Sequence, residues 1–142
     1  QSPLLLSGLA MAGANAQRTG ADGEDGVLTA EEIASLDLSG VDLAVLSACD
    51  TGVGTIMAGE GVFGLRRAMQ VAGVRSLVLS LWSVDDESTR RWMEAFYEGM
   101  LSGGMDVAAA ARSAGRSVLE TRRRRGDGGH PFFWGAFVTT GT

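Results

Sequence analysis

The sequence predicts an α/β fold with a mostly parallel sheet. Two short and almost wholly apolar runs, at 41–48 and 76–82, have the composition of strands that helices cover on both faces. Between them, apolar residues recur at helical spacing, with Val62, Leu65 and Met69 on one face. Two further helices and a last strand follow. This order of elements is typical of parallel sheets joined by right-handed crossovers.

The first apolar segment, residues 2–14, admits two interpretations. Apolar residues followed by small ones are found in signal peptides, but there is neither a basic segment ahead of them nor an initiating Met. We therefore favour a buried strand or edge segment. Because Gln1 is an unusual first residue, we expect the chain to begin inside a longer polypeptide.

The next segment, residues 15–26, is predicted to be a loop. Asp22 and Glu24 begin the alternation of oxygen ligands that a calcium loop requires, but Gly26 interrupts it, so a solvated loop is favoured. Thr29 and Glu32 have the spacing of a capping box and predict the start of a short helix.

Later boundaries follow from turn and cap residues. Gly73 is expected to end the long helix after the glycine-rich loop, and the acidic residues 85–87 suit the positive end of the next helix. Gly103 and Gly104 separate this helix from another that ends in four arginines, 122–125. Residues 130–140, rich in aromatic side chains, are predicted to form the last strand.

Composition limits the classes of function. A chain of 142 residues has the size of one domain, and 12 basic against 17 acidic residues give it a net charge of −5. This balance argues against a general attraction to nucleic acid or to an anionic membrane. The single cysteine excludes an internal disulfide and fits a cytoplasmic location. No apolar run reaches 18 residues, so no membrane-spanning helix is predicted.

The single cysteine is also the most informative residue. Cys49 follows the first apolar run directly, and Asp50, Thr51 and Gly52 after it favour a turn. Open α/β sheets bind ligands at the carboxyl ends of their strands, so a thiol there is a candidate nucleophile. The alternative is a buried cysteine that serves as a small apolar residue.

Three other features of the sequence admit a functional interpretation. His130 is the only histidine and thus the only internal candidate for a base, but its place before Pro131 favours the start of a buried element. The glycine-rich loop at 52–61 lacks the Lys-Ser/Thr ending of a phosphate-binding loop. The arginines at 122–125 are predicted to be a solvated helix end rather than a nucleic-acid contact.

Four segments of the chain occur in the order typical of a known family: Leu46–Gly52, Gly59–Gly73, Ser80–Asp86 and His130–Phe137. Together they resemble the CHAT domain, a caspase-like family of cysteine peptidases commonly fused to tetratricopeptide repeats. The resemblance covers nearly the whole chain. It implies that residues 1–142 are the C-terminal portion of one caspase-like three-layer sandwich.

The resemblance also implies a role for Cys49. In this family the matching cysteine is the nucleophile of a Cys–His dyad that hydrolyses peptide bonds, and its backbone N–H contributes to the oxyanion hole. The family's histidine lies upstream, in a Thr-His-Gly type of stretch that this chain lacks, so His130 does not inherit that role. The resemblance implies a protein or peptide substrate, a repeat region in the same polypeptide, and neither metal nor organic cofactor.

In caspase-like folds, the loop after the next strand lines the specificity pocket. Here that loop contains Trp82, Asp85 and Asp86, and a carboxylate in it would select a basic residue before the scissile bond. The competing interpretation, which we favour, is that both aspartates stabilise the start of the next helix. The alternative function for the whole chain is a catalytically inactive caspase-like module that binds peptides or proteins.

Overall fold

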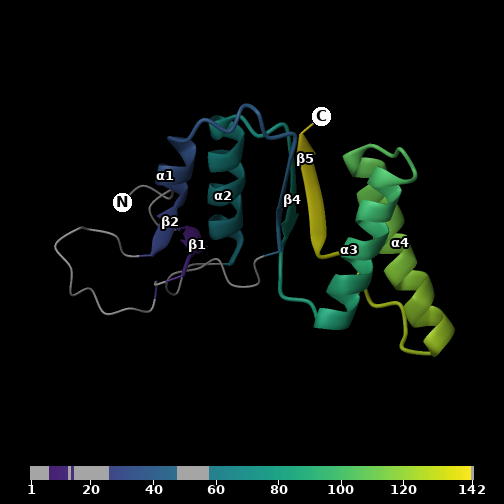
Figure 1. Cartoon of the computed structure of the whole chain (residues 1–142). Coiled ribbons are helices and arrows are strands. Elements are labelled where there is room, and N and C mark those ends of the chain that lie inside the picture. Colours follow the sequence, from purple (N-terminus) through teal and green to yellow (C-terminus); the bar gives the residue numbers. More distant parts are fainter. Residues whose placement is uncertain (1–6, 13, 15–25, 48–57, 142) are drawn as a thin grey trace. The chain divides into compact units, whose positions relative to one another are not determined.

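A computed structural model describes residues 7–12, 14, 26–47 and 58–141, without the side chains of residues 58–60. The chain divides into two compact units, which are described separately. The first unit comprises residues 1–42 and 50–75, and the second comprises residues 43–49 and 76–142. Figure 1 shows the elements of both units in chain order.

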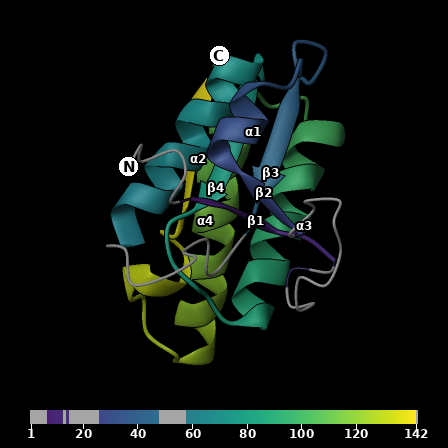
Figure 2. The same cartoon turned by 90° about the vertical axis from the view of Figure 1, so that its left-hand side faces the viewer.

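The first unit contains two short strands and two helices. Strands β1 (Gly8–Ala10) and β2 (Val27–Thr29) pair antiparallel, and helix α1 (Ala30–Ala34) follows β2 directly. Helix α2 (Ala58–Ala72) packs beside α1, as the two views in Figures 1 and 2 show. The strand expected in the first apolar segment is therefore present, but it pairs with β2 and not with the larger sheet.

The predicted helix boundaries of this unit are confirmed. The Thr29 hydroxyl accepts a hydrogen bond from the Glu32 N–H at 3.2 Å, and the Glu32 carboxylate accepts one from the Thr29 N–H at 2.7 Å. This reciprocal pair is the capping box. Gly73 ends α2 with a φ of 103°, and a Cβ there would lie 3.0 Å from the backbone of Ser39. Both facts require glycine at this position.

The second unit contains the main sheet of the described residues. Its strands are β3 (Leu43–Leu46), β4 (Ser76–Ser80) and β5 (Phe137–Gly141), in the order β3-β4-β5. Strand β3 is parallel to β4, whereas β5 is antiparallel to it. The α/β class is thus confirmed. The sheet was expected to be mostly parallel, and among the described strands it has one parallel and one antiparallel pairing.

The direction of β5 has a simple cause. Two helices, α3 (Asp86–Leu101) and α4 (Val107–Arg125), separate β4 from β5, and they pack against each other with opposite directions (Figure 1). One helix after a strand returns the chain to the sheet edge where that strand began. A second helix brings it back to the edge where β4 ended. The strand that follows must therefore run antiparallel to β4.

The core of the second unit lies between the sheet and these two helices. Its largest members are Trp92 and Phe96 of α3, which are 1% and 0% exposed. The Trp92 ring stacks on Phe96 at 5.0 Å between centroids and on Phe137 of β5 at 4.3 Å. Val78 of β4 and three small residues of α4 complete this cluster: Ala110, Ala114 and Val118.

The last predicted strand is shorter than expected. Residues 130–140 do not form one strand, because Pro131–Phe133 form a 3-10 helix, η2, and the strand begins only at Phe137. Pro131 lacks an N–H and has a fixed φ, which favours the first turn of a helix over a central strand position. The aromatic residues that suggested a strand are divided between η2 and β5.

Candidate functional site

The predicted site residues fall into two groups. Cys49, Asp50, Thr51 and Gly52 lie outside the described residues, whereas Trp82, Asp85 and Asp86 are described. The strand that precedes the cysteine is present and ends at Leu46, which pairs in parallel register with Leu79 of β4. Ser47, which follows it, is exposed.

Trp82 belongs to the loop after β4 and is attached to η2. Its indole Nε1 donates a hydrogen bond to the Phe132 carbonyl at 2.8 Å, and the two rings stack at 6.2 Å. The adjacent Leu81 N–H donates to the Ala136 carbonyl at 2.8 Å. A segment some fifty residues later in the chain thus fixes the start of this loop.

Asp85 is the N-cap residue of α3. Its carboxylate accepts a hydrogen bond from the Ser88 N–H at 2.9 Å, as the capping interpretation predicts. Partial burial alone would raise the pKa of Asp85. The hydrogen bonds from Ser88 and the positive charge of Arg122 outweigh that effect, and the pKa lies below the ordinary value of 3.8.

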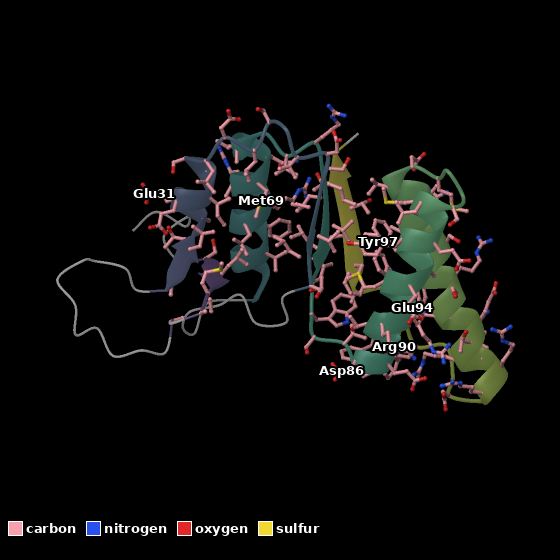
Figure 3. The ribbon with its side chains drawn as sticks, in the orientation of Figure 1. Glu31, Met69, Asp86, Arg90, Glu94 and Tyr97 are labelled. Carbon is pink, nitrogen blue, oxygen red and sulfur yellow. The ribbon has the colours of Figure 1, made fainter. Side chains whose placement is uncertain are left out.

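Asp86 is the first residue of α3 and is exposed. Figure 3 shows it at the start of the helix, with Arg90, Glu94 and Tyr97 following along it. An acidic residue in the first turn is favourable because the helix dipole is positive there. The helix-start interpretation therefore accounts for both aspartates, and their predicted role in a specificity pocket remains a prediction.

Arg122 is a residue of this region that sequence reasoning missed. Its guanidinium lies 3.5 Å from the centroid of the Phe133 ring, and its Nη2 donates to the Asp127 carbonyl at 2.8 Å. The prediction that all four arginines form a solvated helix end is thus wrong for this one. The signal was its spacing, four residues after the buried Val118, on the helix face toward the core.

His130 has a structural role. Its Nδ1 accepts a hydrogen bond from the Phe132 N–H at 3.2 Å, which makes it the N-cap of η2, and the residue is exposed. The expectation that His130 starts a structural element is confirmed, because it caps η2. The element is a 3-10 helix, and it is not buried.

Metal binding and membrane insertion are two further possibilities for the described part of the chain. Its His, Cys, Asp and Glu side chains form no group of three that would hold a metal ion. Among the helices there, none has both the length and the apolar character that a membrane span requires.

We expect Asp85→Ala to lower the free energy of unfolding by about 1 kcal/mol near pH 7, because the Ser88 N–H loses its acceptor. The pKa of Asp85 is depressed in the folded state, so this stability is present above pH 3.8 and is lost as the pH falls through the lower folded pKa. Urea unfolding of both proteins between pH 7 and pH 3 measures the difference.

Asp86→Ala, one position along, is the matched control and should cost only a few tenths of a kcal/mol. A difference between Asp85→Ala and the wild type that stays constant down to pH 3 would contradict this account. So would an equal loss in Asp86→Ala.

Comparison of the sequence with known proteins identifies its family. The CHAT domain model matches residues 1–142. Tetratricopeptide repeat protein 28 from mouse and the same protein from human are each 30% identical to the chain over 116 residues. The match covers 82% of this chain but only 4% of either relative, so the chain spans a small part of their length. The chain belongs to the CHAT domain family, which is caspase-like.

Proposed function

We propose that this chain contributes the nucleophile of a cysteine endopeptidase, with Cys49 as the attacking thiolate. The observation that carries the proposal is the parallel pairing of β3 with β4. It supports a common location for the thiol and for the loop proposed to line the specificity pocket. The family match supports the caspase-like class of this site.

The register of β3 and β4 relates the position of Cys49 to that of Trp82. Leu46 pairs with Leu79, and Cys49 and Trp82 each follow these paired residues by three positions. The carboxyl ends of parallel strands lie at the same edge of a sheet. We therefore expect the thiol to emerge beside the Trp82–Asp86 loop, whose start is fixed by the hydrogen bond to Phe132.

The proposed reaction needs a base. A histidine takes the thiol proton, the thiolate attacks the scissile carbonyl carbon, and the oxyanion accepts hydrogen bonds from backbone N–H groups. The imidazolium then protonates the leaving amine, and water hydrolyses the thioester. His130 serves as the cap of η2. We therefore place the base on an upstream histidine outside these 142 residues.

Substrate selection is the second part of the proposal. Both aspartates are exposed, and Asp85 has one oxygen committed to the Ser88 N–H. Two carboxylates in one loop would favour a basic side chain before the scissile bond. The names of the relatives support a tetratricopeptide repeat region in the same polypeptide. We propose that this region presents the substrate, in the cytoplasm.

The rate at which iodoacetamide alkylates Cys49, followed against pH, tests the proposal. The polypeptide should be extended upstream to include the expected histidine, and mass spectrometry of the Cys49 peptide should follow the reaction. An activated thiol reaches half its maximal rate of alkylation below about pH 7.5, whereas an ordinary thiol reaches it at about pH 8.5. Replacing the histidine by alanine should restore the ordinary profile.

An ordinary profile in the folded, extended wild type would contradict the proposal. It would favour the alternative function, a caspase-like module that binds peptides without cleaving them.

A further inference from the structure

A groove runs between α4 and β5 in the second unit. Its volume is about 570 Å³. Small residues of α4, among them Ala108, Ala111 and Gly115, line one side, and residues of β5 line the other. Because these side chains are small, the groove leaves room for the backbone of an extended chain.

Strand β5 forms the other wall of the groove and has an open edge. Among the described strands it pairs only with β4. Ala136 accepts a hydrogen bond from Leu81, its partner in the register, so Val138 belongs to the next hydrogen-bonded pair. The backbone N–H and C=O groups of Phe137 and Thr139 therefore point to the open edge, and both residues line the groove. Such an edge is a template for an added strand.

Two arginines of α4 give the groove its charge. Arg112 and Arg116 line it, both are exposed, and neither forms an ion pair with a described carboxylate. None of the described residues that line the groove is acidic. Elsewhere in this unit, arginines 90, 91 and 125 do have carboxylate partners, and the chain as a whole is acidic. The groove is thus a positively charged site on a negatively charged chain.

We propose that this groove binds an extended, acidic segment of a partner protein, which adds a strand to β5. Residues four apart on a helix are about 6 Å apart along its axis, and alternate residues of a strand are about 6.8 Å apart. Carboxylates at two alternate positions of the bound strand would therefore match Arg112 and Arg116. The apolar side chains between these carboxylates would belong to the opposite face of the added strand and point away from α4.

A peptide fits these features better than a single-stranded nucleic acid does. Nucleic acids of that kind bind through aromatic rings whose faces are free for stacking. Here the Phe137 ring is stacked on Trp92 at 4.3 Å, and the Trp134 indole is held by a hydrogen bond to the Gly129 carbonyl at 3.0 Å. The open strand edge, in contrast, offers hydrogen bonds that a peptide backbone matches.

Fluorescence anisotropy with a labelled ten-residue peptide tests this proposal in the full chain. The peptide alternates glutamate with valine and threonine, and two further probes, one with lysine for glutamate and one a ten-nucleotide uridine RNA, accompany it. We expect saturable binding of the acidic peptide only. Arg112→Glu combined with Arg116→Glu should weaken it at least about tenfold, because two charge-assisted hydrogen bonds become repulsions.

Two further variants separate the groove from charge alone. Arg66→Glu with Arg67→Glu makes the same charge change on exposed residues of α2 and should leave the affinity within about twofold. Ala108→Trp fills the groove at an exposed position without changing charge and should abolish binding. Circular dichroism checks that each variant is folded.

Equal losses in both arginine pairs, unaffected binding in Ala108→Trp, or tighter binding of the RNA would each overturn the proposal. No binding of the acidic peptide would overturn it as well. None of these outcomes depends on whether Cys49 is a nucleophile.

Discussion

Replacing Trp92 by alanine is expected to lower the free energy of unfolding by about 3–5 kcal/mol. Trp92 is 1% exposed, stacks on both Phe96 and Phe137, and joins α3 to the sheet. The substitution leaves a cavity among small side chains of α4 that are held by the helix backbone, so the site collapses only in part. Urea unfolding monitored by far-ultraviolet circular dichroism measures the loss.

Leu101→Ala is the matched control for this prediction. Leu101 lies in the same helix and is 82% exposed, so its replacement should change the free energy of unfolding by less than about 0.5 kcal/mol. If Trp92→Ala does not fold, Trp92→Phe, which retains one ring, should show a smaller loss. A loss of under about 1 kcal/mol in Trp92→Ala would contradict the packing of Trp92 against Phe96 and Phe137 described above.

The elements with strong local signals were predicted well. The capping box at Thr29, the cap at Asp85 and the end of α2 at Gly73 each depend on neighbouring residues, and all three are confirmed. The direction of β5 was not predicted, because it depends on how many helices lie between two strands. The 3-10 helix at Pro131 was missed because aromatic residues suit both a strand and a packed turn.

In the candidate site, too, features that depend on neighbouring residues were predictable and contacts between distant residues were not. The local role of Asp85 was visible in its position before a helix. The contact of Trp82 with Phe132 joins residues fifty positions apart, so no local pattern showed it. The spacing of Arg122 after Val118 indicated its helix face, but not its partner Phe133. The role of Cys49 comes from the family resemblance and lies outside the described residues. It therefore stays a prediction.

Peptidyl acyloxymethyl ketones are expected to label Cys49 when the polypeptide includes the upstream histidine. The thiolate displaces the acyloxy group and forms a stable thioether, and the peptide occupies the specificity pocket. Cys49→Ala should abolish the labelling, since the remaining groups offer no thiolate there. Replacing the upstream histidine should slow it by at least about 100-fold, the contribution of a positioned base.

Intact-mass measurement of this labelling, with reagents that carry Arg, Asp, Leu or Met at the reactive end, tests the central claim most directly. The account predicts one added mass per chain, dependent on both Cys49 and the histidine. It predicts the fastest reaction for the Arg reagent, because Asp85 and Asp86 are proposed to line the specificity pocket. A preference for Leu or Met would retain the peptidase and exclude the proposed role of the carboxylates. Silence across all four reagents, with the extended protein folded, would contradict the peptidase claim.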